Sequence, residues 1–172
     1  MWWSNLRILL AVFLAISLAA CGFQLRGRAA LPFDALYIEG GNPALLVDLK
    51  RAIGHGSQTR IAATAEEAQA ILRISGEARE KRILSLSGAG RVNEYLLVYR
   101  VAFIVNDRQN RTMLKEQQIE LRRDMTYDDA LVLAKESEEA MLYRDMQNDA
   151  VYQILRRLNG AKPAPPVEPE ED

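Results

Sequence analysis

Residues 94–106 read EYLLVYRVAFIVN, and this stretch decides the fold. Large apolar side chains recur at every second position, which is the pattern of a strand that buries one face. Arg100 marks the opposite face as polar. The stretch therefore predicts a central strand with the core on one side. The residues of its apolar face are Leu97, Tyr99, Val101, Phe103 and Val105.

Two short turn sequences flank this strand, SGAGRVN at 87–93 and DRQNR at 107–111. Turns of this length join antiparallel neighbours, so strands at 69–86 and 112–124 complete a three-stranded meander. The segment 59–69 is ambiguous and is compatible with a turn of helix that leads into the next strand. In 69–86, one face is expected to hold Leu72, Ile74, Gly76 and Ala78, and the other Arg73, Ser75, Glu77 and Arg79.

Two helices are predicted to cover this sheet. The first follows a short strand at 34–40 that ends at Gly40-Gly41; Asn42 is its N-cap, and Gly54 and Gly56 stop it. The second begins with a capping box formed by Thr126 and Asp129 and continues to Asn159, with Gly160 as the C′ glycine. Its apolar positions are Leu131, Ala134, Met141, Leu142, Met146, Val151, Ile154, Leu155 and Leu158.

The predicted element order is β-α-β-β-β-α. The first and second strands are parallel because a helix connects them. The fold class is therefore α/β, a two-layer sandwich whose small mixed sheet of about four strands is covered on one face by two helices. We expect three segments: a lipoprotein signal peptide at 1–20, a folded domain at 21–162 and a disordered, acidic, Pro-rich tail at 163–172.

The N-terminal segment has the anatomy of a secretory signal, with Arg7 before an apolar run that is too short to span a membrane as a helix. The sequence Leu18-Ala19-Ala20-Cys21 resembles the bacterial lipobox, which implies that Cys21 becomes an N-palmitoyl, S-diacylglycerol cysteine after cleavage. Several acyl chains anchor a protein stably, whereas one does not. Gly22 in place of Asp implies sorting to the outer membrane, with the domain on its periplasmic side. The alternative is a cleaved signal and an incidental cysteine.

The composition gives little support for catalysis or nucleic-acid binding. Between residues 21 and 162, 21 basic side chains face 19 acidic ones, and no basic run is present. His55 lies between two glycines, the cluster Glu136, Glu138 and Glu139 is typical of a solvated helix face, and no Cys/His pattern suits a metal. The chain is therefore expected to be no enzyme and to need no cofactor.

Basic residues do gather on the predicted strands and their turn. They either bind phosphates or anionic sugars, or form an ordinary charged sheet edge that prevents aggregation. These residues are Arg73, Arg79, Lys81, Arg82, Arg91, Arg122 and Arg123.

Three stretches together resemble the LptE family of lipopolysaccharide (LPS)-assembly lipoproteins. They are CGFQLRG at 21–27 with the following LP, NEYLLVYRVAFIV at 93–105, and the C-terminal stretch that contains LAKE at 133–136. The resemblance extends from Cys21 to Leu158. It implies a lipid-anchored plug inside the LptD β-barrel, a complex that inserts LPS into the outer leaflet.

The resemblance also implies LPS-binding basic residues. Of the two positions that carry these residues in the family, one corresponds to Lys135 and the other to Gly88 in the hairpin. Because glycine has no basic side chain, Arg91, three residues further on, is the candidate in the hairpin. The expected partners are thus LptD, LPS and the lipid of the outer membrane. The alternative is a lipoprotein scaffold of another envelope complex, without a ligand of its own.

Overall fold

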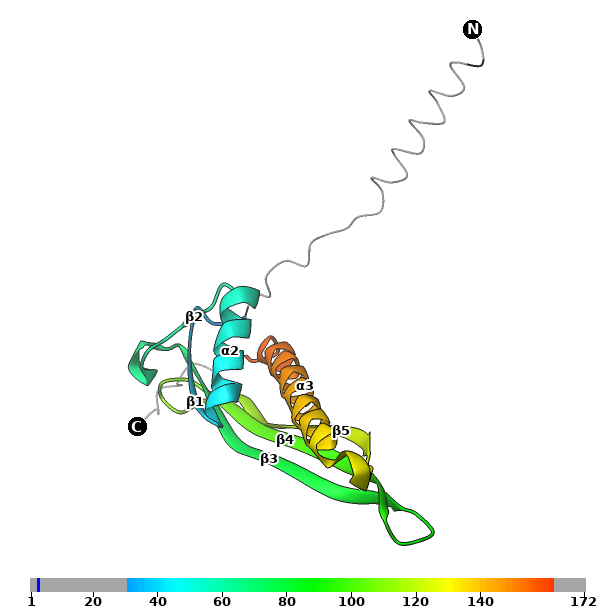
Figure 1. Cartoon of the computed structure of the whole chain (residues 1–172). Coiled ribbons are helices and arrows are strands. Elements are labelled where there is room, and N and C mark those ends of the chain that lie inside the picture. The colour runs from blue at the N-terminus through cyan, green and yellow to red at the C-terminus, as the bar shows by residue number, and fades with distance from the viewer. Residues whose placement is uncertain (1–2, 4–30, 163–172) are drawn as a thin grey trace, which may run out of the picture.

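The computed structural model describes Trp3 and residues 31–162, and Figure 1 shows them with the remaining chain in grey. Cys21, the predicted tail and, apart from Trp3, the predicted signal peptide lie outside the described residues. The element order is β1 (Ala35–Gly40), α2 (Pro43–Gly56), β2 (Arg60–Ile61), the 3₁₀ helix η1 (Ala65–Glu67), β3 (Ala70–Leu86), β4 (Val92–Asn106), β5 (Thr112–Thr126), the 3₁₀ helix η2 (Asp129–Leu131) and α3 (Val132–Leu158).

The five strands form one mixed sheet in the order β2-β1-β3-β4-β5. β1 is parallel to both β2 and β3, and β3, β4 and β5 form the predicted antiparallel meander. The α/β class, the mixed sheet and the two helices that pack on it are confirmed. The sheet has five strands rather than about four, because the ambiguous segment contains the two-residue strand β2.

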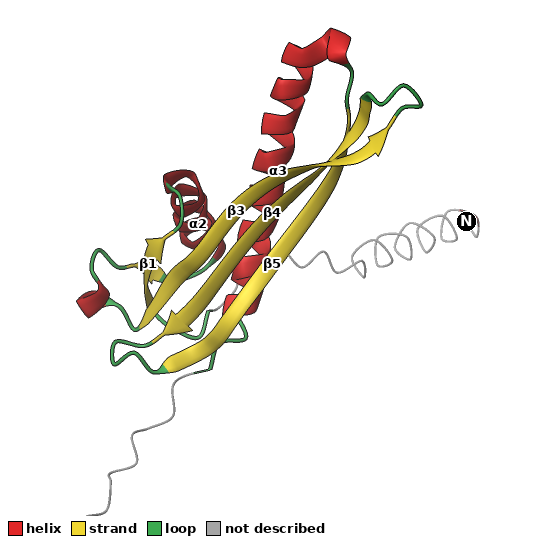
Figure 2. Cartoon of the chain, turned by 90° about the horizontal axis from the view of Figure 1, so that it is seen from below, coloured by secondary structure: helices red, strands yellow, loops and turns green. Residues whose placement is uncertain are grey.

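The core lies between the sheet and the two helices, which lie on the same side of it (Figure 2). The predicted apolar face of β4 is completely buried there, from Leu97 to Val105. α2 adds Leu45, Leu49 and Ile53, and the C-terminal part of α3 adds Met146, Ile154 and Leu158 among others. Each fully buried large side chain contributes about 1.5–3 kcal/mol, so this layer is the main source of stability.

The N-terminus of α2 agrees with the prediction, and its C-terminus differs from it. Oδ1 of Asn42 accepts a 2.8 Å hydrogen bond from the backbone N–H of Leu45, as an N-cap does. Gly54 and Gly56 are the last residues of the helix rather than stops outside it, and Ser57 is the C-cap. Its hydroxyl donates to the carbonyl oxygen of Ile53.

A bulge in β3 changes which side chains face the helices. The pairing with β4 shifts between Ile74 and Gly76, so one extra residue is inserted there. Beyond the shift, Glu77, Arg79 and Lys81 pair with residues of the buried face of β4. The expectation that Gly76 and Ala78 continue the face of Leu72 is therefore wrong, because an insertion of one residue exchanges the two faces of a strand.

The start of the last helix also differs from the prediction. Thr126 is the last residue of β5, and Asp128 is the N-cap of η2, where its side chain accepts a hydrogen bond from the N–H of Ala130. The first buried residue of α3 is Tyr143. Leu131, Ala134 and Met141 are exposed, so the predicted apolar stripe faces the core only in its C-terminal part. Gly160 follows the helix as predicted but not with a positive φ.

The continuous described segment, 31–162, begins and ends at the same end of the molecule, which we call the proximal end (residues 31–35, 59–62, 106–113 and 158–162). The N–H of Lys162 donates to the carbonyl oxygen of Met113, and the carbonyl of Phe33 accepts from the Thr59 hydroxyl. None of the helices formed by the described residues has the length and apolar composition needed to cross a membrane.

Candidate functional site

The two residues that the sequence singles out, Lys135 and Arg91, lie at the end of the molecule opposite to the proximal end. We call this part the distal end (residues 81–94 and 126–139). Figure 2 shows that the tip of the β3–β4 hairpin and the first turns of α3 both lie at this end. The pairing explains why: Glu94 of β4 pairs with Thr126 of β5, and Tyr127 donates its N–H to the carbonyl of Asn93.

Lys135 is held in place by neighbours from two elements. Its ammonium Nζ lies 3.0 Å from Oγ1 of Thr126 and 2.8 Å from Oε2 of Glu138. The side chain is only 15% exposed, so these contacts fix the amine against the end of β5. An incoming anion would have to compete with the Glu138 carboxylate for this amine.

Arg91 closes the turn of the β3–β4 hairpin. Its N–H donates to the Ser87 hydroxyl, and its carbonyl accepts from the N–H of Ser87. Gly90 has a φ of +76°, which a glycine adopts without strain. The Arg91 side chain is exposed and makes no ion pair with any described residue. Gly88 is exposed in the same turn and contributes no side chain.

A basic and aromatic cluster between these two residues was not predicted as a site. Nζ of Lys81 lies 4.2 Å from the ring centre of Tyr95 and 5.8 Å from that of Tyr127. The two rings meet edge to face with centres 5.1 Å apart. Lys81 also pairs with Glu139 of α3 at 2.6 Å. The cluster joins the sheet to the start of α3 through cation–π and ionic contacts.

Most other basic residues of the strands have acidic partners. On the open face of the sheet, Glu80 accepts from Arg82 and Arg100, and Glu120 accepts from Arg100 and Arg122. The hydrogen bonds from the two arginines lower the pKa of Glu80 to about 2. This arrangement agrees with the alternative of an ordinary charged sheet. Of the two site candidates, Lys135 is paired with Glu138 in the same way, and Arg91 makes no ion pair with a described residue.

The described residues provide no group of three or more metal-binding side chains. His55 is exposed in the last turn of α2. The acidic cluster of α3 is partly engaged in ion pairs, since Glu138 binds Lys135 and Glu139 binds Lys81. Glu138 and Glu139 thus form ion pairs with lysines and are not arranged as a pair of carboxylates for acid–base chemistry.

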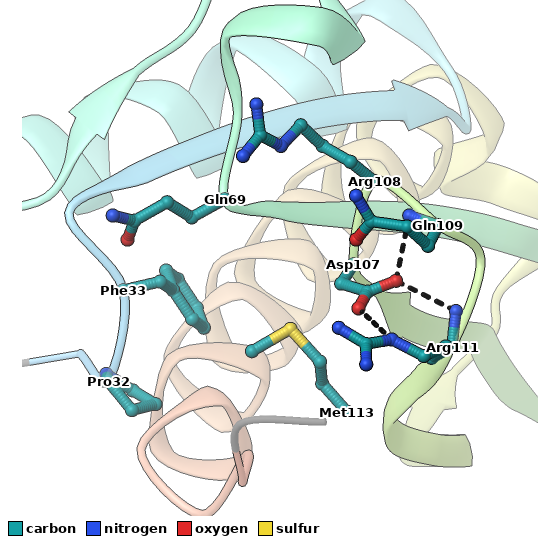
Figure 3. Close-up of a pocket in the computed structure, with 8 residues that line it drawn as sticks. All are labelled: Pro32, Phe33, Gln69, Asp107, Arg108, Gln109, Arg111 and Met113. Atoms are coloured by element: carbon teal, nitrogen blue, oxygen red, sulfur yellow. Dashed lines mark hydrogen bonds and ion pairs between the residues drawn. The ribbon is translucent and has the colours of Figure 1, made fainter. Parts of the chain in front are cut away.

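A cavity of about 280 Å³ lies at the proximal end, far from these residues along the sheet (Figure 3). The β4–β5 turn forms one wall, and Asp107 orders this turn by accepting from the N–H groups of Gln109 and Arg111 and from Nε of Arg111. Phe33 and Met113 line it as well. The cavity is open to solvent and shallow, and none of the predicted site residues lines it.

The fold and its distal end define a class of small two-layer α/β domains with an extended β-hairpin. Within this class, the chain belongs to the LptE lipopolysaccharide-assembly family, whose model matches residues 33–158. No curated protein matches the chain.

Solved structures agree with this family. The solution structure of lipoprotein B from Nitrosomonas europaea is 45% identical, with 80% of this chain and 90% of that chain covered and a TM-score of 0.71. The crystal structure of rare lipoprotein B from Shewanella oneidensis is 27% identical, with 73% and 94% covered and a TM-score of 0.62. A minor lipoprotein from Acinetobacter baumannii, 23% identical, with 81% and 98% covered, shares the fold with a TM-score of 0.62.

Proposed function

We propose that this protein is an outer-membrane lipoprotein that works with the LptD β-barrel, as its plug, to assemble LPS at the outer-membrane surface. The observation that carries the proposal is the family match over nearly the whole described domain. Similarity to structures of proteins named lipoproteins supports an envelope location. The proposal includes acylation of Cys21 as the anchor and a non-enzymatic role.

In this proposal, Lys135 and Arg91 bind phosphate groups of LPS. Both are cationic, both lie at the distal end, and hydrogen bonds between charged partners are about twice as strong as neutral ones. Arg91 has its full donor set available to an anion, whereas the ammonium of Lys135 shares its charge with Glu138. We therefore expect Arg91 to contribute more to phosphate binding than Lys135.

A second function, a scaffold without a ligand of its own, is favoured by one observation. Lys135 and most basic strand residues are already paired with carboxylates in the structure. In that case the partner would be another envelope complex, and the protein would have no ligand of its own.

Two experiments test these proposals. Purification of the acylated protein from outer membranes, with mass spectrometry of the co-purified proteins and of the mature N-terminus, should identify LptD and a triacylated Cys21. A different partner or a mature N-terminus without lipid would contradict the first proposal.

The binding of LPS should fall in a variant with Arg91→Gln and Lys135→Gln. The matched control carries Arg108→Gln and Lys50→Gln, because Arg108 lies in the other hairpin turn and Lys50 is exposed on α2, and neither makes an ion pair with a described residue. Equal loss in both variants would indicate non-specific charge effects, and no loss in either would favour the scaffold.

A further inference from the structure

The cavity at the proximal end lies where the segment 31–162 ends. The N–H of Lys162 donates a 3.1 Å hydrogen bond to the carbonyl oxygen of Met113, and Met113 lines the cavity. Ala161, the residue before Lys162, is buried. The chain that follows Lys162 therefore starts beside the cavity.

One part of the cavity is apolar. The side chains of Phe33 and Met113 point toward each other across it, as Figure 3 shows, and the exposed Pro32 lines it as well. Phe33 is buried and Met113 is half-buried, so the described residues cover these side chains only in part. The volume of about 280 Å³ has room for a few small side chains of another segment.

The other part of the cavity carries positive charge. Arg111 is paired with Asp107 at 2.6 Å, and the Asp107 carboxylate also accepts from two N–H groups of the same turn. Arg108 is exposed and makes no ion pair with a described residue. It also lines a neighbouring cavity together with Glu66, without an ion pair between the two. Arg108 is therefore the cation here whose guanidinium group can bind an anion.

The sequence after Lys162 has the matching chemistry. Residues 163–172, PAPPVEPEED, contain four prolines, one valine, four carboxylates and no cation. Proline-rich segments bind against aromatic side chains at a low entropic cost, because proline restricts the backbone before binding. Carboxylates bind guanidinium groups through charge-assisted hydrogen bonds. The composition of this tail is thus complementary to both parts of the cavity.

We propose that the tail, residues 163–172, docks in the cavity of the proximal end, with its prolines and Val167 against Phe33 and Met113 and its carboxylates on Arg108. The covalent connection favours this occupant, since a short tether gives an effective concentration in the millimolar range. Val167 is five residues from Lys162, a reach of about 18 Å at most. The docked tail joins the end of α3 to the β4–β5 turn, and this contact does not depend on LPS binding.

Photo-crosslinking of the full chain in cells tests the inference. A photoreactive amino acid replaces Gln109, which is exposed and lines the cavity, or, in a second protein, Val167 of the tail. Mass spectrometry of proteolytic peptides identifies the adducts. We expect position 109 to form an adduct with the tail, and position 167 with a peptide that contains Phe33 or residues 107–113. Position 133 at the distal end, where Leu133 is 80% exposed, is the control and should form no adduct with the tail.

Charge variants separate docking from proximity alone. Arg108→Glu should lower the yield of the adduct at position 167 by about threefold or more, because repulsion replaces an attraction. Lys50→Glu is the matched control, since Lys50 is exposed on α2 and makes no ion pair with a described residue. Glu168→Arg and Glu170→Arg, added to Arg108→Glu, should restore the yield.

Three results would overturn the inference. The first is an adduct of position 109 with a phospholipid or another protein in place of the tail. The second is the absence of a tail adduct at position 109 together with adducts of position 167 outside the proximal end, or none. The third is a yield at position 167 that Arg108→Glu leaves unchanged, that Lys50→Glu lowers equally, or that the reversed tail charges do not restore.

Discussion

The hydroxyl of Tyr99 in β4 donates a 2.8 Å hydrogen bond to Oε1 of Glu77 in the neighbouring strand β3. The same carboxylate accepts from the side chain of Asn42, and its Oε2 accepts from the backbone N–H of Asn42 at 2.9 Å. The N-cap of α2 is thus fixed to the sheet through one glutamate. Burial, followed by the hydrogen bond to Glu77, raises the pKa of Tyr99 well above its ordinary range.

Tyr99→Phe should lower the free energy of unfolding by about 1–2 kcal/mol, because it removes a donor from a partly buried carboxylate. Urea denaturation followed by circular dichroism measures this change. Tyr152→Phe is the matched control, since the side chain of Tyr152 is 63% exposed on α3. An effect of equal size in both variants would mean that the hydrogen bond to Glu77 contributes nothing specific.

Glu80→Gln should destabilise the protein near neutral pH and have no effect in strong acid. The folded-state pKa of Glu80 is lowered from 4.5 to about 2 by Arg82 and Arg100, so the carboxylate favours the folded state above pH 4.5. This contribution is lost as the pH falls from about 4.5 to about 2. Thermal unfolding at a series of pH values should therefore show the two melting temperatures converging in this window.

The control for the pH series is Glu136→Gln, because Glu136 is exposed and makes no ion pair with a described residue. Its melting temperature should follow that of the unsubstituted protein at each pH. A constant difference between Glu80→Gln and the unsubstituted protein down to pH 2 would contradict the role assigned to the arginines.

Gly40→Ala should destabilise the protein by more than about 1 kcal/mol. Gly40 ends β1 with a φ of +76°, and a Cβ atom there would collide with the backbone carbonyl oxygen of Ile74 in β3. Gly54→Ala is the control, because Gly54 lies inside α2 with open space around it and alanine is the better helix former. We expect the control to be neutral or up to about 1 kcal/mol more stable in chemical denaturation.

The two methionines of α3 should respond differently to truncation. Met146 is completely buried and Met141 is 50% exposed. Met146→Ala should cost about 2–5 kcal/mol through the cavity that it leaves, and Met141→Ala less than about 0.5 kcal/mol. Equal costs, measured by denaturant unfolding, would show that the N-terminal turns of α3 pack more closely than the structure indicates.

The alternation in residues 94–106 was sufficient to predict the buried face of β4, and the turn sequences were sufficient to predict the meander. The exchange of faces in β3 could not be predicted, because a bulge is a property of the register with β4 and not of residues 69–86 alone. For the same reason, Glu77 and Arg79 were expected on the wrong face.

The sequence predicted only part of the candidate site. Lys135 and Arg91 were taken from the family resemblance, and the structure places both at the distal end; their binding role stays a prediction. The contacts of Lys81 with Tyr95 and Tyr127 join residues that are distant in the sequence, so no local pattern indicates them. The capping box at Thr126 was wrong because β5 continues through that residue, and Asp128 caps the next turn instead.

The location of both described chain ends at the proximal end has a topological consequence. The distal end is a closed surface: the polypeptide only turns back there, at the hairpin and at the start of α3 (Figure 1). A ring-shaped partner can therefore slide over the distal end or withdraw from it without threading either end of the described segment 31–162. Assembly and release would then be steps of simple translation that leave the proximal end undisturbed.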